Sequence, residues 1–156
     1  MFIIWTHRAY QNVRALGITD IRFGTGWAIG GWFVPILWLW RPKQIINDIW
    51  RGSDPDLGGG WRLRWADIRP PVVVTLWWLA GLLSTFVSLF APTTPTTIDQ
   101  AQSLTTTFLI SDAVTILTAV LAIVVVRRLT ERQQARAIRI AAFGQQSFKT
   151  ATPSGP

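Results

Sequence analysis

Residues 72–91 read VVVTLWWLAGLLSTFVSLFA, an uncharged run of twenty residues. A helix of this length rises about 1.5 Å per residue and spans about 30 Å, which is the thickness of the hydrocarbon part of a bilayer. Pro70 and Pro71 precede the run, where a helix loses least from a missing N–H donor, and Pro92 follows it. The run therefore predicts a transmembrane helix over residues 72–91.

A second apolar run occupies residues 103–126 and ends in VTILTAVLAIVVV, directly before Arg127 and Arg128. The connection at 92–102 contains neither Lys nor Arg. Two such runs joined by a short polar connection are typical of a transmembrane helical hairpin. We therefore expect the second transmembrane helix over residues 103–126.

The basic residues predict the orientation of this hairpin. The fifteen Lys and Arg residues fall as three in 1–22, six in 41–70 and six in 127–156. Positive residues beside the ends of spans mark the cytoplasmic side. We expect a multi-pass protein of the bacterial cytoplasmic membrane, with 41–70 and 127–156 in the cytoplasm and 92–102 outside.

The composition argues against catalysis and against a metal or cofactor. The chain of 156 residues is 49% hydrophobic and 15% charged, which is too apolar for an ordinary soluble domain. It has no Cys, one His and one Glu, so few metal ligands or paired carboxylates are available. Because its net charge of +7 sits beside apolar segments, we expect membrane lipids as partners, and no nucleic acid.

Residues 23–40 read FGTGWAIGGWFVPILWLW and form a Trp-rich segment whose relation to the membrane is open. Its length just suffices to cross, but basic residues flank both of its ends. Gly30, Gly31 and Pro35 allow a helix to break and turn back. We favour a re-entrant or interfacial helical hairpin over a full crossing.

Shorter segments predict further helices in a single membrane domain over 1–149. A basic helix is expected over 1–17, an amphipathic helix over 42–51, a mobile loop over 52–60, a cytoplasmic helix over 127–146 and a disordered tail over 150–156. In the amphipathic helix Ile45, Ile46, Ile49 and Trp50 share one side, and Lys43, Gln44, Asn47, Asp48 and Arg51 share the other. The helix either lies on the inner leaflet or packs on its own protein.

Asp112 is the sharpest candidate for a functional residue, because a carboxylate inside a span is costly and usually faces protein or water. Its neighbours Ser111 and Thr115 complete a candidate intramembrane polar site. Asp112 is a buried hydrogen-bonding residue, an interfacial residue or a proton or ion site, and the sequence leaves the three open.

Two further sets of residues have expected contacts with helices or lipids. Small residues permit close helix packing in lipid, and they occur at Gly81, Ser84, Ser88, Thr118 and Ala122. Aromatic and basic residues at a membrane surface bind head groups, and the candidates are Trp40, Arg41, Lys43, Trp50, Arg127 and Arg128. The ten Trp residues end at Trp78, and interfacial anchoring explains them without a ligand.

The first half of the chain resembles an uncharacterised, largely actinobacterial membrane family, domain of unknown function 4328. The resemblance rests on Trp5, His7, Arg8, Ala9, Tyr10 and Asn12, and then on Trp27, Trp32, Phe33, Pro35, Trp40, Arg41, Pro42, Gln44 and Trp50. It continues more weakly through Trp77, Trp78 and VVRRLTERQ at 125–133. The resemblance implies no activity, and it implies additional amino-terminal spans that this sequence lacks.

These observations predict an all-α, polytopic integral membrane protein with a transmembrane helical hairpin and Trp-rich re-entrant or interfacial helices. The leading hypothesis is a non-catalytic interaction protein, an accessory or scaffolding subunit that packs on a larger membrane complex or on copies of itself. The alternative is an oligomeric channel or transporter in which Asp112 lines a water-filled path. An enzyme acting on lipid head groups is disfavoured, since Arg supplies neither a base nor a nucleophile.

Overall fold

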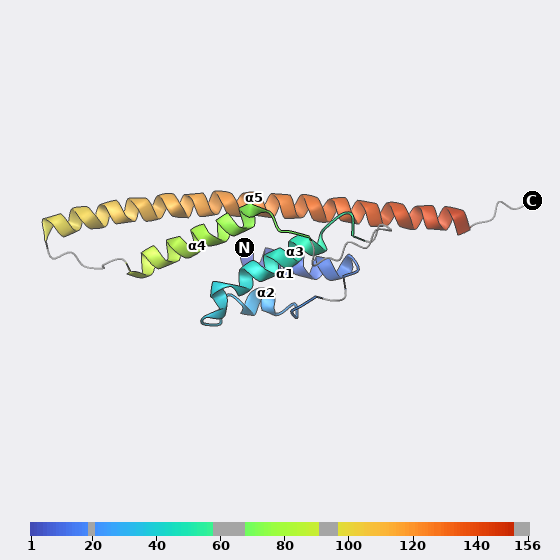
Figure 1. Cartoon of the computed structure of the whole chain (residues 1–156), viewed down its shortest axis with the longest axis horizontal. Helices are drawn as coiled ribbons and strands as arrows, with labels where there is room; N and C mark the ends of the chain where they lie inside the picture. Colours follow the sequence, from blue (N-terminus) through green and yellow to red (C-terminus); the bar gives the residue numbers. More distant parts are fainter. Residues whose placement is uncertain (19–20, 58–67, 91–96, 152–156) are drawn as a thin grey trace, which may run out of the picture. The chain divides into compact units, whose positions relative to one another are not determined.

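The computed structural model describes residues 1–18, 21–57, 68–90 and 97–151. Every secondary-structure element in these ranges is a helix, which confirms the prediction of an all-α chain. The chain divides into two compact units, unit 1 with residues 1–70 and 127–156 and unit 2 with residues 71–126. The longest helix contributes to both units, and each unit is described by itself below (Figure 1).

Unit 2 contains the two helices that are long and apolar enough to cross a membrane. Helix α4 covers Val72–Phe90, which lies within the predicted first span of 72–91, and residue 91 is outside the described residues. Helix α5 covers Ile98–Ala151, and its apolar part lies before Arg127. The structure thus supports a location in a membrane, while the number of crossings and their orientation stay predictions.

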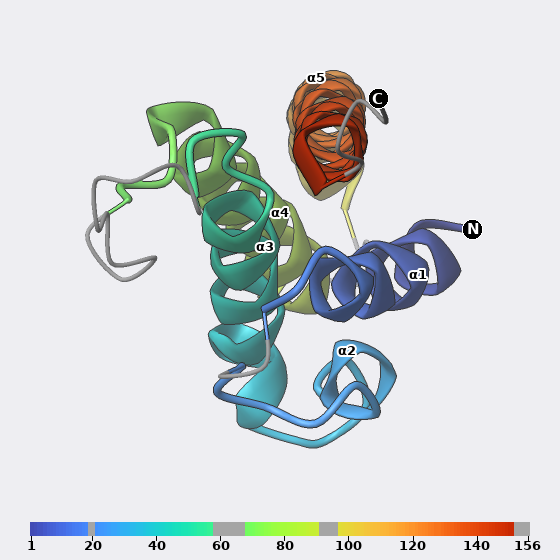
Figure 2. The same cartoon turned by 90° about the vertical axis from the view of Figure 1, so that its right-hand side faces the viewer.

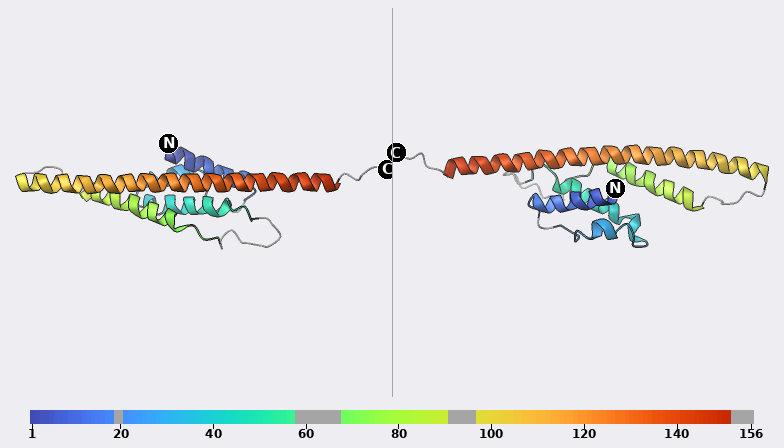
Figure 3. Two further views of the ribbon diagram at one scale, coloured as in Figure 1. Left: turned by 90° about the horizontal axis from the view of Figure 1, so that it is seen from above. Right: turned by 180° about the vertical axis from the view of Figure 1, so that it is seen from behind.

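Helix α5 is one uninterrupted helix where the sequence predicted two consecutive segments and a tail (Figure 3). It contains no Pro, and its one glycine, Gly144, is exposed. A helical glycine costs only about 1 kcal/mol relative to Ala, so the helix continues through it to Ala151. Residues 152–156 of the predicted tail lie outside the described residues.

The core of unit 1 lies where helix α1, Phe2–Ala15, packs on helix α3, Arg41–Gly52 (Figure 2). Tyr10 of α1 and the three isoleucines of α3 are completely buried, and Val13 is 1% exposed. The apolar side of α3 is therefore covered by the protein itself. Any contact of α3 with lipid would have to use its opposite side.

Residues 23–40 form two short helices instead of one long helix. Helix α2 covers Trp27–Gly30, and the 3-10 helix η1 covers Leu37–Leu39. Between them the backbone turns, and Ile36 adopts a φ of 71°, which is strained for a β-branched residue. The segment is broken near the Gly and Pro residues that the sequence singled out, while its place in or on a membrane stays a prediction.

Helix α1 ends at a glycine, as the sequence indicates. Gly17 has a φ of 89°, the left-handed conformation that glycine adopts without steric cost. The Gly17 and Ile18 N–H groups donate to the carbonyls of Arg14 at 2.9 Å and Val13 at 3.3 Å. These bonds satisfy two carbonyls at the helix end in a Schellman motif.

The contact of Gly52 with α1 gives a test of the core. A Cβ on Gly52 would collide with Cγ1 of Val13, whose branched side chain has little freedom to move away. We expect Gly52→Ala to lower the free energy of unfolding by about 1–3 kcal/mol, measured by circular dichroism in mild detergent. The control is Gly144→Ala, which meets no atom within 4 Å and should be neutral or stabilising. An unchanged Gly52→Ala protein would contradict the packing of α1 on α3.

Candidate functional site

A row of three arginines on α5 holds the loop that follows α3. Arg132, Arg136 and Arg139 are spaced by four and three residues and so share one face of the helix. Arg132 forms an ion pair with Asp54, and Arg139 forms one with Asp56. We call these three residues the arginine row. They lie in unit 1, as does the loop they hold.

Arg136 is the most buried member of the row, with 5% of its surface exposed. Its Nη1 donates to the Asp54 carbonyl at 3.1 Å, and its Nη2 donates to the Leu16 carbonyl at 2.9 Å. Leu16 is the C-cap of α1, so the guanidinium satisfies a carbonyl at the negative end of that helix. Burial lowers the pKa of Arg136, and the nearby Asp54 carboxylate partly opposes this effect.

Arg132 combines its ion pair with an aromatic contact. Its guanidinium carbon lies 4.5 Å from the centre of the Trp50 ring, within the range of a cation–π interaction. The Asp54 carboxylate also accepts a hydrogen bond from the Asp56 N–H at 2.9 Å, which turns the loop. Trp50, for which a lipid head-group contact was expected, also contacts Arg132 of the arginine row.

The arginine row contacts the described part of the loop predicted over 52–60. Gly52, Ser53 and Asp54 are buried, and the Ser53 hydroxyl donates to the Ile49 carbonyl at 2.6 Å. In the described part of the loop, the Asp54 and Asp56 carboxylates and the Asp54 carbonyl bind guanidinium groups of α5, a distant part of the chain. Residues 58–60 lie outside the described residues.

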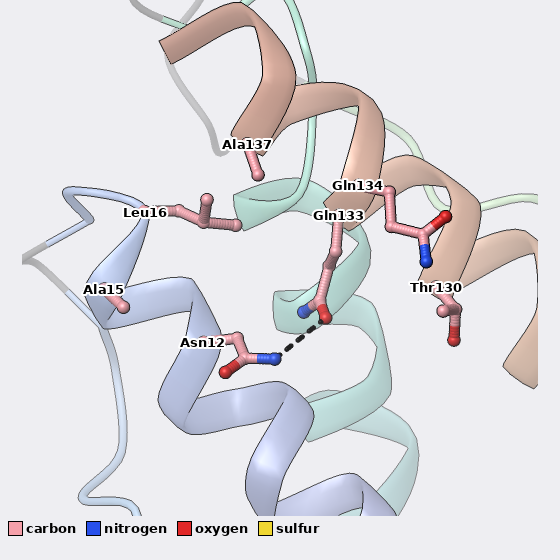
Figure 4. Close-up of a pocket in the computed structure, with 7 residues that line it drawn as sticks. All are labelled: Asn12, Ala15, Leu16, Thr130, Gln133, Gln134 and Ala137. Atoms are coloured by element: carbon pink, nitrogen blue, oxygen red, sulfur yellow. Dashed lines mark hydrogen bonds between the residues drawn. The ribbon is translucent and has the colours of Figure 1, made fainter. Parts of the chain in front are cut away.

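A groove of about 390 Å³ lies between α1 and α5, beside the arginine row (Figure 4). The residues that line it are uncharged, and they are Asn12, Ala15, Leu16, Thr130, Gln133, Gln134 and Ala137. Gln133 accepts a hydrogen bond from the Asn12 amide at 3.4 Å and donates one to the Ala9 carbonyl at 2.9 Å. The groove is therefore suited to neutral groups that form hydrogen bonds, and unsuited to ions.

A second charged cluster fixes the polar side of α3. Asp48 is 1% exposed, and its Oδ1 accepts a hydrogen bond from Arg22 at 2.6 Å and lies 3.8 Å from Arg51. Its Oδ2 is buried without a hydrogen-bond partner in the part of the chain that the structure describes. Asp48, on the polar side of α3, is thus covered by Arg22.

Burial shifts the pKa of two groups in unit 1, the Asp48 carboxyl and the Tyr10 hydroxyl. Burial raises the pKa of the Asp48 carboxyl, and the two arginines only partly offset this effect. Burial, with the negative charge of Asp48, also raises the pKa of Tyr10 to about 12. The Tyr10 hydroxyl donates to the Phe23 carbonyl at 3.2 Å, so it serves as a neutral donor that joins α1 to the segment before α2.

In unit 2 the structure brings together part of the predicted intramembrane set. The hydroxyls of Ser84 and Thr115 are 2.8 Å apart, and a Cβ on Gly81 would lie 3.6 Å from Cγ2 of Thr118. Small side chains of α4 thus contact small polar side chains of α5. Ser111 and Ala122 are half-buried, and Ser88 is exposed.

Asp112 lies apart from this contact. Its side chain is exposed on α5, and no hydrogen bond or ion pair joins it to any other residue that the structure describes. A carboxylate on the outer surface of an apolar helix needs water or a polar group from outside the chain. The role of Asp112 stays a prediction.

The residues predicted to bind head groups differ in their surroundings. Arg127 and Arg128 are exposed, and Trp40 is 42% exposed. Arg41 lies over two aromatic rings, with its guanidinium carbon 4.1 Å from the centre of Phe23 and 5.2 Å from the Trp27 ring. Lys43 is half-buried. Arg41 is thus engaged inside unit 1.

A family model described as a domain of unknown function (DUF4328) matches residues 1–131 of the chain. The chain belongs to this family. Neither the curated proteins nor the solved structures that were compared with the chain contain a match. The DUF4328 match ends just before Arg132, so the two aspartates of the loop lie inside it, whereas the arginine row follows it.

Little in the sequence indicates the arginine row. Asp54 and Asp56 look like ordinary turn residues, and three arginines on a helix look like a solvated face. Two features of the sequence point to the row. The three arginines are spaced so that they share one face of α5, and the chain has few acidic residues with which they could pair. Among the described residues no cluster of His, Asp and Glu side chains has the composition of a metal site.

The two aspartates of the loop should differ in their effect on stability. Asp54 and Arg132 are 13% and 22% exposed, so Asp54→Asn should lower the free energy of unfolding by about 1.5–3 kcal/mol. Asp56 and Arg139 are 64% and 54% exposed, so the matched variant Asp56→Asn should cost less than about 1 kcal/mol. Equilibrium unfolding in mild detergent measures both, and equal losses would contradict the difference in burial.

Asp48 should make folding depend on pH in an unusual direction. Its folded-state pKa is raised above the ordinary value of 3.8, so the folded protein takes up a proton more readily than the unfolded chain. The stability due to this group is complete below pH 3.8 and declines as the pH rises through the raised value. We expect the unfolding free energy of wild type minus that of Asp48→Asn to fall as the pH rises above 4. A difference that rises with pH would contradict this sign.

Proposed function

We propose that this chain is a non-catalytic integral membrane protein that acts as an accessory or scaffolding subunit of a larger membrane complex. The observation that carries the proposal is the exposed apolar surface of the two long helices. Leu83 of α4 is 54% exposed and Leu109 of α5 is 65% exposed, and similar side chains surround them. Such a surface requires a lipid or protein environment.

The exposed side chains form a continuous stripe along α4. Leu79, Leu83, Phe86 and Phe90 recur at spacings of four, three and four residues, and each is exposed. This spacing places them on one face of the helix, which the contact of Gly81 and Ser84 with α5 does not cover. The stripe is therefore the surface that we expect to meet lipid or a partner helix.

Unit 1 supports an interaction role because it presents a built, uncharged groove beside the arginine row. Its buried charges are used for structure, since Asp48 and Asp54 each bind arginine side chains. The proposed role is recognition.

The test is to purify the tagged full chain from its native membrane in mild detergent and to measure the mass of the particle. We expect a stoichiometric larger partner, identified by mass spectrometry. Leu83→Ser/Phe86→Ser should release it by disturbing the exposed stripe. The matched control is Thr85→Ser, an exposed polar position on the same helix whose spacing from Leu79 and Phe86 places it off the stripe, and this variant should retain the partner. A particle with one copy of the chain and no partner would contradict the proposal.

The second candidate function is an oligomeric channel or transporter, and the exposure of Asp112 favours it. Because two apolar helices cannot enclose a pore, several copies would have to assemble with Asp112 facing a water-filled path. Asp112→Asn should then abolish proton or cation flux in reconstituted vesicles, while Ser88→Ala, an exposed polar position on α4, leaves it unchanged. A homo-oligomer with flux would support this candidate, and no flux from the wild-type oligomer would contradict it.

A further inference from the structure

The arginines of unit 1 divide into two groups by their partners. Arg22, Arg51, Arg132 and Arg139 lie in ion pairs with Asp48, Asp54 or Asp56. Arg69, Arg127 and Arg128 are exposed, and no ion pair joins any of them to an acidic group in the described part of the chain. This holds although Glu131 lies one helical turn beyond Arg127 and Arg128.

Arg69, Arg127 and Arg128 lie next to the two points in the sequence where one unit ends and the other begins. Unit 2 begins at Pro71 and ends at Val126. Arg69 comes two residues before the first junction, and Arg127 and Arg128 come directly after the second. Unit 2 itself contains no Lys or Arg. Both ends of the apolar unit therefore carry exposed guanidinium groups with no acidic partner among the described residues, and we call them the junction arginines.

We propose that the junction arginines, Arg69, Arg127 and Arg128, bind the phosphates of anionic phospholipids at the surface of the membrane. A guanidinium presents donors in a planar fork that matches two phosphate oxygens. The apolar side chains next to these arginines are exposed, Val72 at 72% and Ile123 at 53%, so acyl chains are contacted beside the head group. A soluble phosphate or a nucleic acid would use the charge and leave this apolar surface in water.

The same argument separates the junction arginines from the other exposed cations of unit 1. Arg8 and Arg14 are also exposed and without an acidic partner among the described residues, but they lie on α1, far along the chain from either apolar helix. Ile4, one turn before Arg8, is exposed, but the exposed large apolar side chains of this region are limited to Met1 and Ile4 and do not continue along a long apolar helix. Arg8 and Arg14 provide a control that removes the same charge from another place.

The inference rests on the proposed membrane location, which is tested first. The full chain is reconstituted in vesicles of phosphatidylcholine and floated in high salt, which screens electrostatic attachment. A protein that leaves the vesicles would contradict the membrane location itself. A protein that stays proceeds to the lipid measurement, whose failure would overturn only the role of the junction arginines.

The lipid measurement counts phosphatidylglycerol and phosphatidylcholine bound to the detergent-solubilised protein by native mass spectrometry at low salt. We expect preferential binding of phosphatidylglycerol, weakened about 25-fold in Arg127→Gln/Arg128→Gln, from about fivefold for each arginine. The control Arg8→Gln/Arg14→Gln should stay within about twofold of wild type. Thermal unfolding verifies that both variants are folded.

Three results would overturn the proposal. The first is equal binding of the two lipids by the wild-type protein. The second is an equal loss of phosphatidylglycerol in the control variant, because net charge rather than the junction arginines would then attract the lipid. The third is displacement of the lipid by a short RNA at equal phosphate concentration, which would indicate a soluble polyanion as the ligand.

Discussion

Unit 1 depends on the burial of one guanidinium group. Arg136 of α5 donates to the carbonyl of Leu16, the C-cap of α1, and to the carbonyl of Asp54 in the loop after α3. It thereby joins three segments, since it lies 120 residues from Leu16 and 82 residues from Asp54 in the sequence. A buried cation is costly unless polar groups surround it, and here two carbonyls and the nearby Asp54 carboxylate offset part of the cost. The Arg136 Nε is buried without a hydrogen-bond partner among the described residues. The two carbonyl contacts order the loop and place the uncharged groove between α1 and α5.

Both units are helical in their described residues, but they differ in where their apolar side chains lie. Unit 1 buries its apolar side chains against one another, as the fully buried isoleucines of α3 show, and uses arginine to satisfy what remains polar. Unit 2 leaves many of its large apolar side chains exposed, and its two helices meet where Ser84 lies beside Thr115 and Gly81 lies close to Thr118. This arrangement suits the proposed membrane location, because close packing of small residues holds helices together in lipid.

Membership of the DUF4328 family adds a boundary to this description. The family match ends between Glu131 and Arg132, within an uninterrupted helix. The continuation of α5 supplies the arginine row that binds the loop inside the matched region. The site thus combines residues on both sides of the family boundary, and a chain cut at that boundary would leave Asp54 without its guanidinium partners.

Sequence reasoning recovered the elements because they depend on local properties. The hydropathy and length of the run at 72–91 predict helix α4, Val72–Phe90. The position of Gly17 predicts the end of α1, because glycine adopts positive φ without steric cost. Sequence reasoning missed the pairing of Asp54 with Arg132 and the cover that Arg22 gives to Asp48. Charged side chains have no periodicity that reveals a distant partner.

The sequence by itself determined that the chain is helical, that two of its helices suit a bilayer and that positive charge borders them, because these properties follow from single residues and their spacing. Only the tertiary structure decided which charges are consumed in ion pairs and which remain exposed. That division depends on which atoms come into contact after folding. The Arg132 guanidinium forms an ion pair with Asp54, whereas the Arg127 guanidinium remains exposed and available to a ligand.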